Sequence, residues 1–450
     1  NQNASVRETF NTALGYEALR GSTSAASNSG QYNTAIGDAA LWTNSMGNHN
    51  TSVGAQALYQ NTQGEQNTAM GFGALYNNKE NDRSTAVGYM AMYNADNRTT
   101  SERSTYNTAV GFQALSGSST PSANTGQENT AVGDQALSLN ASGSFNTGCG
   151  AFALQFNDAG NYNTAVGNMS MVSNNGGSYS TAVGYQAMYA TTTGGSNLAV
   201  GYRSLYSNVG KRRNTVVGIE AMFNADDTPT SGDAYNTAIG YKALYGSGTP
   251  ASNTGTSNTA VGDQALFGNT SGNNNVALGR NALDGNTVGS NNTAIGYEAD
   301  VAFNNLTNAT AIGYGASVNA SNKIVLGNSS ATTVGGYGTW TNYSDARLKE
   351  NISYKDDLGL DFVMKMRTAS YNYIDDENKR RRDGLIAQDV QQALDELGVE
   401  FSGLVVDDDE MKTLNLSYGE FVIPLINAVK EQQAQIEALR KEIEALKADR

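Results

Sequence analysis

Asn129-Thr130-Ala131-Val132-Gly133 is one copy of a five-residue phrase that recurs, with small variations, through about three quarters of the chain. Its glycine stands at positions 15, 37, 54, 71, 88, 111, 133, 150, 167, 184, 201, 218, 240, 262, 279, 296, 313 and 327. Eleven of the seventeen intervals are 17 residues, four are 22, one is 23 and the last is 14. A unit this short cannot bury a core alone, so we predict that successive copies stack and bury a continuous one.

Two positions in each repeat carry the apolar signal. The residue before the glycine is always apolar, from Leu14 through Val132 to Leu326, and the fourth residue after it is Leu or Met in the first fifteen repeats, as at Leu137. We interpret both positions as core anchors. Cys149, the single cysteine, stands before a glycine and is therefore predicted to be a small buried hydrophobic residue.

The repeat length and its residues favour a β-coil over helices. Seventeen residues are too few for a helical hairpin, and the Gly, Asn and Ser between the anchors disfavour helix. We predict a parallel β-solenoid with two short strands per turn and with Gly or Asn at positive φ at the corners. The extra residues of the longer repeats, which hold Pro121, Pro229 and Pro250, are predicted to be loops that leave the coil.

The composition changes abruptly near position 340. Residues 1–343 hold 45 of the 50 glycines and 32 of the 70 charged residues, whereas the remaining 107 residues hold 5 glycines and 38 charges. We therefore predict a stalk over residues 1–335, a linker over 336–343 and a small α+β domain over 344–450, in a protein that is mostly β.

Several classes of protein do not fit the sequence. The net charge is −14, and the only compact basic runs are 211–213 and 379–382, so we predict no nucleic-acid partner. No run of about eighteen apolar residues predicts a membrane span. His49 is the single histidine and has no partner ligands nearby in the sequence, so we predict neither a metal nor a cofactor. The chain begins with Asn1, and we interpret it as a fragment or a processed product.

The C-terminal segment 420–450 has the pattern of a coiled-coil helix. Apolar residues recur at spacings of three and four, with Lys and Glu between them. Ile or Val at the first heptad position with Leu at the fourth favours two strands, but Gln432 interrupts the pattern. The alternative is a helix that packs on its own domain. The candidate assembly residues are Val422, Leu425, Val429, Gln432, Ile436, Leu439, Ile443 and Leu446.

Three motifs follow one another in the C-terminal domain. They are Ser344-Asp345-Ala346-Arg347-Leu348-Lys349, Gly384-Leu385-Ile386-Ala387-Gln388-Asp389-Val390 and Leu416-Ser417-Tyr418. In this order they resemble the intramolecular chaperone domain at the C-termini of phage endosialidases, tail spikes and some bacterial surface proteins. The repeats before them are similar to the left-handed β-rolls of trimeric autotransporter adhesin heads, which have a shorter unit, and to repeats of phage tail fibres.

The resemblance implies a homotrimer whose C-terminal domain promotes folding of the fibre and then releases itself. The bond it implies is Tyr343–Ser344, with Ser344 as nucleophile, Lys349 as its base and Asp345 in support. A serine hydroxyl needs an adjacent base, and a lysine can act as one only when its amine is neutral, which burial favours. The alternative from spacing alone is that Ser344 caps a short helix and Lys349 is a surface charge.

Our first hypothesis for function is a trimeric tail-fibre or surface-adhesin stalk, placed in a virion, that attaches to a host or environmental surface. A glycan is one candidate receptor, because aromatic residues such as Tyr185 and Tyr202 are predicted to stack in ladders. The chain would at most be a single-turnover serine peptidase. The alternatives are a polysaccharide-depolymerising tail spike, for which Asp38, Asp134 and Asp263 are the recurring carboxylates, and an extracellular bacterial adhesin that keeps its trimerisation domain.

Overall fold

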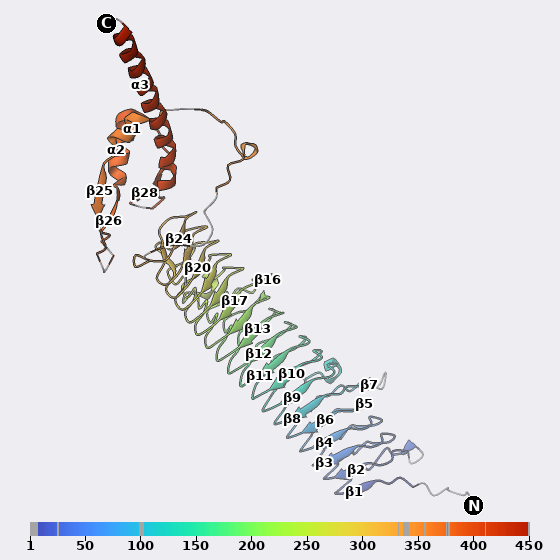
Figure 1. Cartoon of the computed structure of the whole chain (residues 1–450). Coiled ribbons are helices and arrows are strands. Elements are labelled where there is room, and N and C mark those ends of the chain that lie inside the picture. The colour runs from blue at the N-terminus through green and yellow to red at the C-terminus, as the bar shows by residue number, and fades with distance from the viewer. Residues whose placement is uncertain are drawn as a thin grey trace, which may run out of the picture. The chain divides into compact units, whose positions relative to one another are not determined.

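The computed structural model describes residues 8–24, 27–98, 103–331, 333–335, 342–354, 357–374, 376, 379–409 and 411–448. The chain forms two compact units, Asn1–Gly315 and Ala316–Arg450 (Figure 1). The first is a parallel β-solenoid, and the second contains short strands and helices and ends in a long helix. The predicted fold class is therefore confirmed. The domain boundaries at 335 and 344 remain predictions, and linker residues 336–341 lie outside the described part.

One three-residue strand per turn builds the sheet of the first unit. Each strand pairs in parallel with the strand one repeat later, so that Thr130, Ala131 and Val132 lie opposite Thr147, Gly148 and Cys149. Figure 1 shows these strands stacked from the blue end onward. The strands are β1 (Thr12–Leu14), β2 (Thr34–Ile36), β3 (Thr51–Val53), β4 (Thr68–Met70), β6 (Thr85–Val87), β8 (Thr108–Val110), β9 (Thr130–Val132), β10 (Thr147–Cys149), β11 (Thr164–Val166), β12 (Thr181–Val183), β13 (Leu198–Val200), β15 (Thr215–Val217), β17 (Thr237–Ile239), β18 (Thr259–Val261), β19 (Val276–Leu278), β20 (Thr293–Ile295) and β22 (Thr310–Ile312).

The prediction of two strands per turn is wrong for most coils. Gln135 and Leu137, which follow the repeat glycine by two and four residues, have φ of 51° and 52°. These left-handed values are incompatible with an extended strand, so this side of most coils is a series of turns. The exception is at the end of the stalk, where β21 (Asp300–Val301) occupies this position. The prediction that Gly or Asn would fill the corners is also incomplete, because Gln, Leu, Met and Tyr take most of the left-handed positions that are not glycine. Each costs about 1 kcal/mol or more, which stacking between coils must offset.

The repeat glycine is required by both conformation and space. Gly133 has φ of 136°, where a side chain is strained, and a Cβ built on it would lie 2.6 Å from the carbonyl carbon of Gly150 in the next coil. The same close approach recurs along the column, for example between Gly150 and Gly167. The glycine period in the sequence therefore sets the spacing of the coils.

The core of the coil is thin and consists of small residues plus one large anchor. Ala131, Ala136 and Leu137 are fully buried, and so are the equivalent residues of most other coils. The first coil differs, because Ala13 is exposed there. The residue before the glycine is not a core anchor, which corrects the sequence-based interpretation. Val132 is 38 % exposed and Cys149 is exposed. Because side chains alternate along a strand, burial of the central alanine directs both of its neighbours outward.

Two columns of buried asparagines hydrogen-bond one coil to the next. In the first, Asn146 donates its backbone N–H to Oδ1 of Asn129 (3.0 Å) and its Nδ2 to the carbonyl of Gly160 (2.8 Å). In the second, Asn157 donates its Nδ2 to Oδ1 of Asn140 (2.6 Å) and to the same Gly160 carbonyl (3.0 Å). These ladders satisfy backbone groups of the turns, which would otherwise be buried without partners.

The longer repeats add loops and short strands. Pro121 and Pro250 begin equivalent 3-10 helices, η2 (Pro121–Ala123) and η3 (Pro250–Ser252). Two parallel pairs also lie beside long repeats: β5 (Asn81–Asp82) with β7 (Arg103–Ser104), and β14 (Lys211–Arg212) with β16 (Gly232–Asp233). The chain then continues through β21 (Asp300–Val301), β23 (Ser317–Val318) and β24 (Ile324–Leu326).

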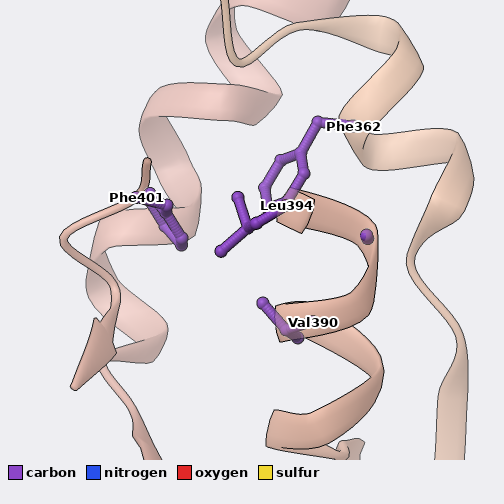
Figure 2. Packing of buried hydrophobic residues seen from close by; sticks show 5 residues of the cluster. Phe362, Val390, Leu394 and Phe401 are labelled. Carbon is purple, nitrogen blue, oxygen red and sulfur yellow. The ribbon is translucent and has the colours of Figure 1, made fainter. Parts of the chain in front are cut away.

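The second unit has its own hydrophobic core, which Figure 2 shows from close by. Phe362, Val390, Leu394 and Phe401 pack together with Ala393 and are all buried. The elements are η4 (Ala346–Leu348), α1 (Leu360–Lys365), β25 (Thr368–Tyr371), β26 (Arg382–Leu385), α2 (Ala387–Leu397), β27 (Leu404–Val406), β28 (Leu414–Leu416), η5 (Tyr418–Phe421) and α3 (Val422–Ala448). β25 pairs with β26 and β27 with β28, both antiparallel.

Candidate functional site

The predicted nucleophile and base are in contact. Nζ of Lys349 donates a hydrogen bond to Oγ of Ser344 over 2.9 Å. The two side chains meet, although they are five residues apart, because the chain between them turns through η4. The backbone of Lys349 is extended after this turn. Both side chains are exposed in the single chain, and Tyr343, which supplies the carbonyl of the predicted cleaved bond, is 93 % exposed. The arrangement joins a hydroxyl to an amine beside an accessible peptide bond.

Asp345 is the cap of η4, a role that the alternative interpretation gave to Ser344. Its Oδ1 accepts the backbone N–H of Arg347 (2.9 Å), and its carboxylate forms an ion pair with the Arg347 guanidinium. The hydrogen bonds from Arg347 hold the pKa of the Asp345 carboxyl below its usual value. With Asp345 as the cap, the Ser344 hydroxyl does not serve as the N-cap of this turn and is engaged by Lys349.

The second and third C-terminal motifs meet in space. The hydroxyl of Tyr418 accepts the backbone N–H of Leu385 over 2.8 Å. A Cβ on Gly384 would lie 2.4 Å from that hydroxyl oxygen, so the glycine makes room for the tyrosine. Burial, together with its neighbour Tyr373, raises the pKa of Tyr371 to about 12. These residues form a structural contact within the unit.

The heptad stripe of α3 is exposed along the whole described helix. Leu425, Val429 and Leu439 are 49 %, 62 % and 56 % exposed, and the other apolar members of the stripe are between 45 % and 63 % exposed. A different face of the helix packs on its own unit: Pro424 and Ala428 are buried, and the Glu431 carboxylate accepts the backbone N–H of Leu360 (2.9 Å). Packing on the same chain therefore leaves the stripe without a partner among the described residues.

Aromatic ladders run along the stalk, as the repeat predicts. Tyr59 and Tyr76 stack with ring centroids 4.9 Å apart, and Tyr185 and Tyr202 stack at 5.5 Å. His49 belongs to such a ladder, with its ring 5.0 Å from that of Tyr32. Sequence reasoning did not identify this stacking role for the histidine, although its place five residues before a repeat glycine is shared with aromatic residues in other repeats.

The recurring aspartates after the repeat glycine are far apart within one chain. Asp38 and Asp134 are separated by five coils, about 24 Å at the usual strand spacing. Asp134 and Asp263 are separated by seven coils, about 34 Å. A pair of glycosidase carboxylates lies within about 10 Å, so these three residues cannot form one within a chain. In the described ranges, no three His, Cys, Asp or Glu side chains gather as a metal site requires.

Sequence reasoning missed one half-buried carboxylate. Asp300 stands four residues after Gly296, the position that holds Leu or Met in the earlier coils. Its oxygens accept the backbone N–H groups of Gly285 (2.9 Å) and Val301 (2.7 Å). Burial raises the pKa of Asp300, and burial also raises that of Asp284 in the preceding coil. Because both Asp300 oxygens bind backbone, we interpret this residue as part of the coil structure.

The fold defines a β-solenoid stalk that precedes a small α+β region with a long C-terminal helix. The family model described as chaperone of endosialidase matches residues 344–399, beginning at Ser344 itself. The resemblance predicted for the C-terminal domain is therefore confirmed over this range. No curated protein and no solved structure matches the chain. None of the described helices combines the length and the apolar character needed to cross a bilayer.

Proposed function

We propose that the chain is the stalk of a homotrimeric, tail-fibre-like or tail-spike-like protein whose C-terminal domain assembles three chains and then cuts itself off between Tyr343 and Ser344. The observation that carries the proposal is the 2.9 Å contact between Lys349 and Ser344 at the first residue of the family match. The unpartnered stripe of α3 supports the assembly step. Attachment to a host or environmental surface is the role that such a stalk serves in a phage particle, outside the host cell.

The cleavage would be an intramolecular acyl transfer. Oγ of Ser344 attacks the carbonyl carbon of Tyr343 while Nζ of Lys349, as the neutral amine, takes the hydroxyl proton. The proton passes to the nitrogen of Ser344 as the peptide bond breaks, which leaves an ester between the Tyr343 carbonyl and the serine oxygen. Water then hydrolyses the ester, giving a carboxylate on Tyr343 and a free amine on Ser344.

Assembly would also supply what the single chain lacks at this site. Ser344 and Lys349 are both exposed to solvent in the single chain. Neighbouring subunits that cover the pair would favour the neutral amine. Under this proposal, cleavage follows trimer formation, and release of the domain marks a stalk that has folded.

The test is the intact mass of the purified full chain under denaturing conditions. Wild type is compared with Ser344→Ala and with Ser353→Ala, a control at another exposed serine of the same segment. The proposal expects wild type and the control to split between Tyr343 and Ser344, while Ser344→Ala stays at full length. Full-length wild type would contradict the cleavage step, and we would then regard the domain as a permanent trimerisation clamp.

A further inference from the structure

The outer face of the long parallel sheet is apolar and uncovered. Each strand directs its first and third residues outward and its central residue inward. The third residues form a column that we call the pre-glycine column, made of Leu14, Ile36, Val53, Met70, Val87, Val110, Val132, Cys149, Val166, Val183, Val200, Val217, Ile239, Val261, Leu278, Ile295 and Ile312. They are half-buried or exposed; Val166 and Leu278, for example, are 37 % and 47 % exposed.

Charge is absent from this face over all seventeen strands. The pre-glycine column contains only aliphatic residues, methionine and the one cysteine. The other outward position is threonine in fifteen strands, and Leu198 and Val276 replace it in the remaining two. The chain has 28 basic and 42 acidic residues, so their exclusion from a solvent-exposed face needs a cause. Depletion of charge is characteristic of the buried centre of a protein interface.

The period of the column identifies its partner. A covering surface must offer an apolar contact at every coil, about 4.8 Å apart, over seventeen successive coils. Another copy of the same stalk, aligned in parallel and in register, offers an apolar contact at this spacing because its coils follow the same repeat. The α3 stripe of the same chain is also apolar and unpartnered, which points to the same partner.

The area is sufficient for a stable assembly. Seventeen side chains that each expose roughly 60 Å² give a strip on the order of 1,000 Å² per chain, against about 800 Å² per partner in a standard stable interface. The flanking threonine column adds to this area. A strip of this size on a chain that stayed single would be unusual for a soluble protein.

We infer that the pre-glycine column and its threonine neighbours are the interface along which identical stalks pack together. That three chains assemble rests on the proposed function. That they pack through this face rests on the uncharged outer surface of the sheet. The columns then converge toward the shared axis, and the apolar residues before the glycines form a core between chains instead of within one.

The first test places charge on this face in the full chain, with Ser344→Ala present throughout so that the C-terminal domain stays attached. Val132→Asp with Val166→Asp is compared with Leu139→Asp with Phe156→Asp, at positions of similar exposure (42 % and 47 %) six residues after the repeat glycine. Most other coils carry polar residues, Gly or Ala at the control position, as at Gln60 and Asn77. For both variants and the parent chain, the mass of the particle is measured by light scattering, and the melting temperature is measured by thermal unfolding.

The column variant is expected to lose the trimer or to lower its melting temperature by more than about 10 °C, while the control stays within a few degrees. A parent trimer that tolerates both variants equally would overturn the inference and leave the proposed function standing. A parent chain that runs as a monomer would contradict both.

A second test does not depend on a damaging substitution. Copper phenanthroline oxidation of the folded parent chain is expected to join Cys149 of two subunits by a disulfide, so that denaturing gels without reductant show cross-linked dimers. The control carries Cys149→Ala with Leu139→Cys and is expected to remain uncross-linked. Cross-linking of the control but not of the parent would place a different face at the interface.

Discussion

The amine of Lys349 lies 2.9 Å from the hydroxyl oxygen of Ser344, and it is Asp345 that caps the short turn between them. The turn therefore has its own cap, and the serine hydroxyl is free to be held by the lysine. This contact allows the proposed catalytic role of the motif to be tested by substitution. It also allows the base to be tested separately from the nucleophile.

Replacing Lys349 by arginine tests the base. Arginine keeps the positive charge and the hydrogen-bond donors, but it does not lose its proton in proteins, so it cannot accept one from Ser344. We expect cleavage to slow by at least about 100-fold. Lys349→Arg that cleaves like wild type would show that the lysine acts through charge alone.

Replacing Thr191 by asparagine tests the inner ladder of the stalk. Thr191 interrupts the second asparagine column between Asn174 and Asn208, and Oδ1 of Asn174 and Oγ1 of Thr191 have no hydrogen-bond partner among the described residues. An asparagine would donate to Asn174 and satisfy it. We expect the free energy of unfolding to rise by about 1 kcal/mol, measured by thermal unfolding. Thr193→Asn, at an exposed site, is the control and should change little.

Substituting the repeat glycine tests the coil spacing. Gly133→Ala would place a Cβ 2.6 Å from the Gly150 carbonyl carbon at φ of 136°, so the two coils must separate. We expect a loss of about 3 kcal/mol or more. Gly176→Ala, where a Cβ would meet nothing within 4 Å and φ is not in the left-handed region, should be neutral or slightly stabilising. Equal stability of the two variants, by denaturant unfolding, would contradict the described packing.

The stacking of the coils could be predicted from the sequence, but the direction of some side chains could not. The glycine period and the anchors such as Leu137 were enough to predict a stacked coil, because the glycine recurs in all repeats and the Leu or Met anchor in the first fifteen. The direction of Val132 was misjudged because an apolar residue was taken as buried, when the small central Ala131 is the one that fits the narrow interior. The left-handed φ of Leu137 was also missed, since the intrinsic preference of leucine argues against it and only stacking between coils enforces it.

The C-terminal motifs were informative for a different reason. Gly384 and Tyr418 depend on each other sterically, so their joint presence signals a specific fold. The contact between Ser344 and Lys349 followed from their spacing across a turn. The exposure of both side chains was not predictable from the motif, because spacing along the chain carries no information on what covers a side chain.

The pH dependence of stability tests the half-buried Asp300. Burial raises its pKa, so the folded state binds a proton more tightly than the unfolded state does, and ionisation costs stability. That cost is present above the folded pKa and absent below the unfolded value of about 3.9. Asp300→Asn removes the charge, so its melting temperature relative to wild type should fall as pH is lowered from 7 to 4. A difference that stays constant with pH would show that Asp300 is not perturbed.

Native mass spectrometry of freshly purified wild type tests the central claim most directly, since it reports chain count and cleavage together. We predict a particle of three stalk chains, each ending at Tyr343 and lacking the 344–450 fragment. A single uncut chain of 47.3 kDa would contradict both assembly and self-release.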